Sequence, residues 1–117
     1  MEAELLKSSF NSQERGLYAE RLVEDYFIEK GYQIRFHRKK IFGVEYDWVF
    51  QNKTELIYVE VKSVKSADFY IQRWPWRQKQ RFLRVAAVLA AQQKAIFYLA
   101  LVDYKDKVHL FKVGSEI

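Results

Sequence analysis

Hydrophobic positions in the first third of the chain repeat with a helical period. This spacing is shared by Leu17, Leu22, Val23, Tyr26 and Phe27. Asn11 is typical of a helix N-cap, and Glu14 three residues later completes a capping box. Gly31 suits the position just after a helix end. The pattern therefore predicts a first helix over Ser12–Lys30.

The chain then changes to a two-residue period, which is typical of strands. Ile34–Ile41 alternates loosely and is rich in β-forming residues. In Val44–Phe50, one face is predicted to carry Val44, Tyr46, Trp48 and Phe50, and the other Glu45, Asp47 and Val49. In Leu56–Lys62, one face carries Ile57, Val59 and Val61, and the other Tyr58, Glu60 and Lys62. With a turn at Gln51–Glu55, these strands should form an antiparallel meander.

A second helix and two more strands are predicted in the rest of the chain. The helix covers Trp76–Gln93, with a core stripe of Phe82, Val85, Ala86 and Leu89. Ala95–Val102 and Lys107–Val113 read as strands joined by a turn at Asp103–Asp106. The element order is α-β-β-β-α-β-β. Because a strand–helix–strand unit is normally a right-handed parallel crossover, we expect an α/β fold with a mixed five-stranded sheet.

Length and composition narrow the class of protein. A chain of 117 residues, half of them hydrophobic, fits one domain over 1–117 with a real core. The absence of cysteine excludes a disulfide framework and a thiolate zinc site. His37 and His109 are the only histidines, so a histidine-rich metal site is not expected either. Any metal should be a hard cation held by carboxylates.

No segment predicts export or membrane insertion. Met1–Asn11 contains Glu2, Glu4 and Lys7 and lacks a basic segment followed by an apolar run. The longest apolar stretch elsewhere, Val85–Ala91, is too short to span a bilayer. We therefore expect a cytoplasmic location and no membrane partner.

Positive charge is in excess and is clustered. The sequence has 20 basic and 15 acidic residues, a formal net charge of +5. One cluster comprises Arg35, Arg38, Lys39 and Lys40; the other comprises Arg73, Arg77, Lys79, Arg81 and Arg84. Clustered basic charge favours a polyanionic partner, with nucleic acid the first candidate. A solvated basic face is the alternative.

Three of the charged residues on the predicted strands are expected to meet on central strands, where charge is unusual. Glu60 and Lys62 are two residues apart and share a face, and Asp47 comes alongside if the neighbouring strand pairs in register. Unpaired buried charge is expensive, and a Mg²⁺ or Mn²⁺ ion would relieve the repulsion between the two carboxylates. Lys62 could then orient an attacking water or offset phosphorane charge, as metal-assisted phosphodiester hydrolysis requires. An exposed strand with an ordinary Glu–Lys pair is the alternative.

Three short motifs extend this interpretation. They are Gly16-Leu17-Tyr18-Ala19-Glu20, Gly43-Val44-Glu45-Tyr46-Asp47 and Tyr58-Val59-Glu60-Val61-Lys62. In their order and spacing, over about residues 12–95, the sequence resembles the PD-(D/E)xK nuclease superfamily. The resemblance is to Holliday-junction resolvases of the archaeal type and to the similar YraN-type bacterial proteins. It implies a restriction-endonuclease-like three-layer core.

The resemblance also implies roles for individual residues. Asp47 and Glu60 would be metal ligands, Lys62 the catalytic lysine, and Glu20 the helix glutamate that completes the catalytic metal site. Auxiliary positions would be Glu45, as an acidic neighbour of the ligands, and Gln78 or its rival Lys79, from the second helix. The sequence departs from the YraN pattern at Val44, which separates the glycine from the glutamate, and after Lys62, where the usual glycine is missing.

The segment Arg73-Trp74-Pro75-Trp76-Arg77 stands where that glycine is missing. Aromatic rings flanked by arginine can stack on unpaired bases or wedge into a distorted duplex. They can equally form a self-association surface, or cap the sheet against the second helix. The DNA-binding candidates are therefore Arg35, Arg38, Lys39, Lys40, Arg73, Trp74, Trp76 and Arg77. His37 is expected beside a phosphate or on the plain surface, and His109 in a structural role.

Together these features predict a metal-dependent DNA endonuclease, with branched, Holliday-junction-like DNA as the expected substrate. A small domain leaves no room for an added recognition module, which favours recognition of shape. Because a four-way junction has two-fold symmetry, a homodimer follows. Two alternatives remain open: a nuclease fold kept for DNA or protein binding with little catalysis, and a nuclease subunit with a protein partner in a larger restriction or mobile-element system.

Overall fold

Two helices and five strands make up the fold, which a computed structural model describes for residues 9–41, 43–66, 75–92 and 95–113. The elements are α2 (Ser12–Glu29), β1 (Gln33–Ile41), β2 (Val44–Gln51), β3 (Leu56–Ser63), α4 (Trp76–Gln92), β4 (Ala95–Val102) and β5 (Val108–Val113). The predicted order α-β-β-β-α-β-β is confirmed, with element ends shifted by at most one residue.

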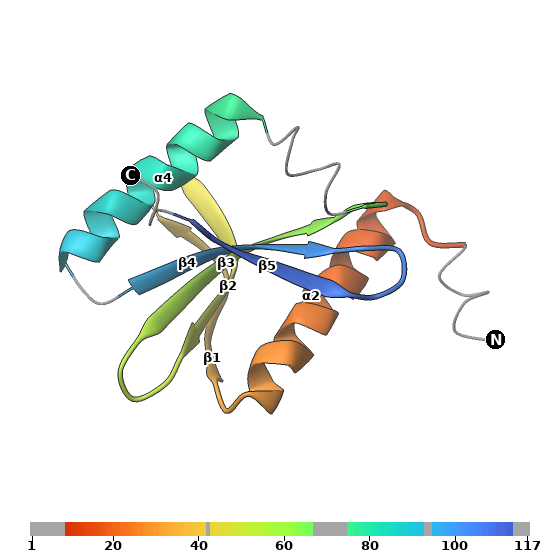
Figure 1. The fold of residues 1–117 in the computed structure, drawn as a ribbon, viewed down its shortest axis with the longest axis horizontal. Coiled ribbons are helices and arrows are strands. Elements are labelled where there is room, and N and C mark those ends of the chain that lie inside the picture. The colour runs from red at the N-terminus through yellow and green to blue at the C-terminus, as the bar shows by residue number, and fades with distance from the viewer. Residues whose placement is uncertain (1–8, 42, 67–74, 93–94, 114–117) are drawn as a thin grey trace.

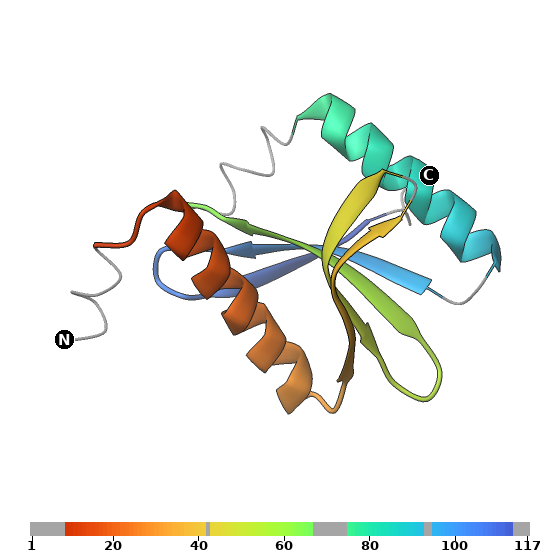
Figure 2. The same cartoon turned by 180° about the vertical axis from the view of Figure 1, so that it is seen from behind.

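The strands form one mixed sheet in the order β1-β2-β3-β4-β5. β3 and β4 are parallel, with α4 as the crossover between them, and the other neighbours are antiparallel. The two helices lie on opposite faces of this sheet (Figure 1), and the view from behind shows the same arrangement (Figure 2). The predicted three-layer α/β core is therefore confirmed, and β3 is its central strand.

The core has two parts, one on each face of the sheet. On one face, Val23 and Phe27 of α2 pack against residues of β2 and β3, and the ring of Phe27 stacks on Phe50 with centroids 4.6 Å apart. On the other, Phe82 and Val85 of α4 pack in a separate cluster. Burying such a side chain contributes about 1.5–3 kcal/mol each. The side chains of Ala86 and Leu89, the rest of the predicted stripe, lie outside the described residues.

The ends of α2 follow the sequence closely. The capping box is present: Glu14 N donates to Asn11 Oδ1 at 2.8 Å, and Asn11 N donates to Glu14 Oε1 at 3.2 Å. Gly31 adopts a φ of +91°, a backbone conformation that ends helices and suits glycine. These two signals fix the position of α2, and with it that of Glu20.

One predicted face is wrong. Tyr46 was expected to share a face with Trp48 and Phe50, but it packs in the α4-side cluster with Val49. Val44 also packs on that side. The strict alternation of β2 breaks between Tyr46 and Trp48, where the backbone ladder to β3 stops. Short-range periodicity carries no information about where a neighbouring strand diverges.

In the described part of the chain, no helix is long and apolar enough to cross a membrane.

Candidate active site

Asp47 lies where β2 loses its backbone pairing with β3. The ladder between β2 and β3 runs only from Gln51↔Leu56 to Trp48↔Val59. Beyond it, the Asp47 carboxylate takes the place of a backbone acceptor, because Val61 N donates to Asp47 Oδ2 at 2.6 Å. A charge-assisted bond of this kind holds the carboxylate in one orientation. The break in the sheet therefore presents a fixed acidic group beside β3.

The strand on the other side of β2 is also irregular at this level. The β1–β2 pairs His37↔Trp48 and Lys39↔Tyr46 flank Asp47. Arg38, which lies between them on β1, adopts a φ of +60°. For a residue other than glycine this left-handed conformation costs about 1–3 kcal/mol, and such strain gathers at functional sites. Strain on β1 and lost pairing on β2 thus coincide.

Glu60 and Lys62 lie on β3, in register with Leu99 and Leu101 of β4. Lys62 Nζ is 3.5 Å from Glu60 Oε1, and the Glu60 side chain is only 13% exposed against 35% for Lys62. Because β3 is central in the sheet, the alternative of an exposed strand with an ordinary Glu–Lys pair does not hold. The amine is the part of this pair that an incoming group can reach.

The two carboxylates are held in an environment that disfavours their charge. Burial raises the pKa of Asp47 to about 6, against the lowering effect of the Val61 N–H. Burial and then the charge of Asp47 raise the pKa of Glu60 to about 7. Lys62 lowers both values but does not offset the burial. Near neutral pH this pair would be stabilised by a proton or a cation.

Tyr46 adds an unpaired donor to the same region. Its side chain is fully buried, and its hydroxyl is the one buried side-chain polar atom without a hydrogen-bond partner among the described residues. Burial is the main cause that raises its pKa, followed by the charge of Glu60. An unsatisfied buried hydroxyl costs about 1–3 kcal/mol. Sequence reasoning missed Tyr46 because its alternation placed the ring on the other face.

Glu20 is near the acidic pair but bound to β1. Its carboxylate is 3.1 Å from His37 Nε2 and 3.6 Å from Arg38, while Trp48 Nε1 donates to the Glu20 carbonyl at 3.0 Å. The His37 ring stacks on Trp48 at 4.0 Å. The charge of Glu20 still raises the pKa of Asp47. His37 is exposed on β1 and holds the Glu20 carboxylate through this contact.

The donor set suits a hard divalent cation in kind and in charge. Asp47 and Glu60 offer carboxylate oxygens, which Mg²⁺ and Mn²⁺ prefer, and burial raises the pKa of both groups. Among the described residues, however, no three acidic or histidine side chains come close enough together to hold a metal. Glu20, on α2, would have to give up its contacts with His37 and Arg38 of β1 to complete a three-carboxylate site.

The predicted auxiliary residues lie further out. Glu45 is exposed on β2 opposite Lys40, and its charge raises the pKa of both Asp47 and Glu60. Gln78 and Lys79 are half-buried in the first turns of α4. In the part of the chain that the structure describes, neither makes a side-chain hydrogen bond or ion pair with the acidic pair.

Another α4 side chain does reach the strands. Arg81 Nη2 donates to the carbonyl of Gly43 at 3.1 Å, at the start of β2. The sequence offered this residue only as part of a basic cluster. The contact ties α4 to the β1–β2 turn, and so to the strand that carries Asp47.

The basic cluster of β1 forms an exposed edge. The first eight residues of this strand are all exposed. The ring of Phe36 has Lys39 Nζ 4.6 Å and the Arg35 guanidinium 5.6 Å from its centroid, and Arg35 also donates to Gln51 at 3.0 Å. These contacts leave the cations on the surface, as a phosphate-binding edge requires.

Only part of the second group of DNA-binding candidates lies within the described residues. Arg73, Trp74 and the Trp76 side chain lie outside the described residues. Arg77 is exposed at the start of α4. His109, expected in a structural role, bonds to Asp103 Oδ2 at 3.0 Å, and this bond is the main cause that lowers the pKa of Asp103.

Comparison with known proteins finds relatives by sequence and a solved structure with a similar fold. No family model matches the chain. A UPF0102 protein from Acidiphilium cryptum is 30% identical over 82 residues, 70% of this chain and 64% of that protein. A UPF0102 protein from Maricaulis maris is 29% identical over 87 residues, 74% of this chain and 68% of that protein. The chain thus spans less than two thirds of the Acidiphilium cryptum relative.

A solved structure with a similar fold is that of an XisH family protein from Nostoc punctiforme. It superimposes with a TM-score of 0.52 over 81% of this chain and 98% of that one, at 13% identity. That likeness concerns the fold, which is restriction-endonuclease-like. The UPF0102 relatives, at about 30% identity, agree with the likeness to YraN-type proteins that the sequence motifs indicate.

Proposed function

We propose that this protein is a metal-dependent DNA endonuclease that hydrolyses phosphodiester bonds at Asp47, Glu60 and Lys62. The observation that carries the proposal is the burial of two carboxylates, with pKa values raised toward neutrality, beside one accessible lysine amine. Two such acids on neighbouring strands cost stability unless something positive is held between them. The nuclease-like relatives support the same reading.

Each residue of the candidate active site has a separate role in this proposal. Asp47 and Glu60 would hold Mg²⁺ or Mn²⁺, with Glu20 as the candidate third ligand, and the bound cation would supply Lewis-acid charge to the phosphate. The Val61 N–H fixes the direction of the Asp47 carboxylate. Lys62 offsets the negative charge that develops on the phosphate oxygens as water attacks phosphorus and the bond to the leaving oxygen breaks.

DNA is the substrate that the surface charge favours. The exposed cations of β1 lie on the strand next to the one that carries Asp47, so a phosphate backbone along this edge would pass the acidic site. A small domain that reads shape would act on branched DNA. Two copies would cut a two-fold symmetric junction, which makes a homodimer part of the proposal.

One observation favours a second candidate, a DNA-binding module with little hydrolysis. Glu20 is held by His37 and Arg38, and the described residues contain no ready group of three metal ligands. If Glu20 keeps its contacts with His37 and Arg38 when DNA binds, the site has only two carboxylates. The fold would then serve recognition rather than cutting.

Incubation with branched, linear and single-stranded DNA in Mg²⁺ or Mn²⁺ distinguishes these two candidates. The endonuclease predicts cleavage products that appear with wild type and disappear with Glu60→Gln, because an amide is a poor ligand for a hard cation. Arg21→Ala, on the exposed face of α2, serves as the matched control. Wild-type protein that binds branched DNA but yields no more product than Glu60→Gln would favour the binding module.

A further inference from the structure

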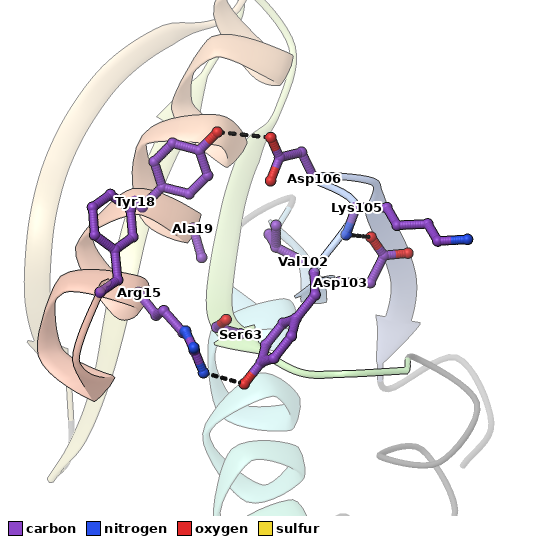
Figure 3. Close-up of a pocket in the computed structure, with 10 residues that line it drawn as sticks. Arg15, Tyr18, Ala19, Ser63, Val102, Asp103, Lys105 and Asp106 are labelled. Carbon is purple, nitrogen blue, oxygen red and sulfur yellow. Dashed lines mark hydrogen bonds between the residues drawn. The ribbon is translucent and has the colours of Figure 1, made fainter. Parts of the chain in front are cut away.

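A cavity of about 520 Å³ opens beside the candidate active site, between the first half of α2 and the turn that joins β4 to β5 (Figure 3). Small-ligand sites commonly measure about 300–1,000 Å³. Neither Asp47, Glu60 nor Lys62 lines it. Its position and chemistry are therefore independent of the acidic pair and need a separate explanation.

The walls of the cavity are held together by contacts between distant parts of the chain. The Tyr18 hydroxyl donates to Asp106 Oδ2 at 2.7 Å, and Arg15 donates to the Tyr104 hydroxyl (Figure 3). Asp103 fixes the turn by accepting from Lys105 N at 2.9 Å and from Lys107 N at 3.0 Å. Bridges of this kind keep the cavity open in a defined shape, which lowers the entropic cost of binding.

The lining combines aromatic rings with both signs of charge. Phe10, Tyr18 and Tyr104 supply the rings, and the Tyr104 side chain is 44% exposed. The Arg15 guanidinium lies 4.5 Å from the centroid of the Tyr104 ring. Lys105 adds a second cation, while Asp103 and Asp106 add carboxylates.

This mixture selects among ligands. A bare phosphate would face two carboxylates as well as two cations, and an aliphatic ligand would leave the polar groups unpaired. A nucleobase has a planar face to stack on tyrosine, and its edge both donates and accepts hydrogen bonds. Arg15 and Lys105 can meet the phosphate attached to such a base.

On two elements, a residue that lines the cavity is next in sequence to a residue of the candidate active site. Ala19 and Ser63 line the cavity, and the residues next to them are Glu20 on α2 and Lys62 on β3. Neighbouring Cα atoms are only about 3.8 Å apart. Because side chains alternate along a strand, Ser63 and Lys62 point to opposite faces of β3. A nucleic-acid strand at the acidic site would reach the cavity by passing around the end of β3.

We infer that the cavity binds an unpaired base of the DNA strand whose phosphate lies at the acidic site. This inference rests on the proposed function for its substrate class and adds a source of selectivity to it. A base in a fully paired duplex is stacked and out of reach, whereas a base at a branch point or in a single strand is free to enter. The cavity would thus make the enzyme prefer distorted DNA over a regular duplex.

The test uses two matched DNA hairpins in EDTA, one fully paired and one with a single unpaired 2-aminopurine, whose fluorescence falls on stacking. Wild type should quench the unpaired probe and bind that hairpin more tightly than the paired one. Tyr104→Leu, which removes the ring, should lose the quench and about tenfold of the preference. Tyr104→Phe keeps the ring but loses the hydroxyl that accepts from Arg15, so it should keep the quench and most of the preference.

A second pair of variants guards against loss of folding. Arg15→Ala should reduce the preference, and Arg21→Ala, an exposed arginine of the same helix, should not. Equal quench and equal preference in wild type, Tyr104→Leu and Arg15→Ala would overturn the inference. Cleavage is measured separately in Mn²⁺. If DNA is cleaved but neither quench nor preference depends on the Tyr104 ring, the base-site inference fails and the proposed endonuclease stands. If the quench depends on the ring but no DNA is cleaved, the proposed endonuclease fails and the base site stands.

Discussion

Two charged regions lie side by side in the same sheet and differ in burial. The basic edge of β1 carries its cations on the surface, where water screens them and their proximity costs little. The acidic pair on β2 and β3 is enclosed, and its pKa values are raised toward neutrality. Exposed charge of one sign indicates a partner of the other sign. Enclosed like charge, kept at a cost in stability, is the feature on which the proposed cation site rests.

Glu20 connects the two regions. Its carboxylate pairs with His37 and Arg38 of the basic edge, and its charge also raises the pKa of Asp47. A phosphate that binds Arg38 would compete with Glu20 for this pairing. The following predictions test whether the two regions have the separate tasks that their burial indicates.

The largest effect is expected on catalysis. Lys62→Ala should lower the single-turnover rate of DNA cleavage by about 10²–10³, because its amine offsets charge that develops only in the transition state. DNA affinity and the melting temperature should change little. Lys39→Ala on the basic edge is the control and should affect binding more than rate. An equal loss of rate in both variants would contradict the assignment of catalysis to the acidic site and of DNA binding to the basic edge.

The next effect concerns pH. In EDTA, the folded state holds protons on Asp47 and Glu60 that the unfolded chain releases, because their pKa values rise from 3.8 to about 6 and from 4.5 to about 7. The free energy of unfolding should therefore fall as pH rises from about 4 to 7, by about 2–3 kcal/mol for each carboxyl. Asp47→Asn and Glu60→Gln should each flatten this fall in urea titrations at several pH values. A curve that rises with pH over this range, or one that neither variant changes, would contradict the buried-charge account.

A smaller effect is expected at Tyr46. Because its buried hydroxyl has no partner among the described residues, Tyr46→Phe should raise the free energy of unfolding in EDTA by about 1 kcal/mol. Tyr32→Phe, which removes a hydroxyl that donates to Glu55 at 2.8 Å, should lower it. Denaturant titrations of both variants measure the contrast. If Tyr46→Phe destabilises as much as Tyr32→Phe, the Tyr46 hydroxyl has a partner in the fold.

The smallest effect belongs to the basic edge. Lys39→Ala with Lys40→Ala should weaken DNA binding for all sequences alike and reduce the slope of log affinity against log salt by about one unit for each lost phosphate contact. These lysines are cleaner to test than Arg38, which also pairs with Glu20. Lys53→Ala, in the exposed turn after β2, is the control. An unchanged slope would make β1 a solvated face.

Local patterns predicted the elements and part of the site. The capping box placed α2, and the two-residue period of β3 put Glu60 and Lys62 on one face. The face of Tyr46 could not be predicted, because it depends on where β2 parts from β3. The pairing of Glu20 with His37 needs contacts across 17 residues, and the cavity needs contacts across 88 and 89. Periodicity describes neighbours along the chain and cannot predict contacts between residues so far apart in the sequence.

Thermal melting with and without Mn²⁺ tests most directly whether the acidic pair exists to hold a cation. A ligand of the native state adds about 2.7 kcal/mol at a hundredfold excess over its Kd, so Mn²⁺ should raise the melting temperature of wild type clearly. Asp47→Asn should start from an equal or higher melting temperature in EDTA, because it relieves repulsion, and should lose most of the rise. The same Mn²⁺ response in wild type and Asp47→Asn would contradict the account.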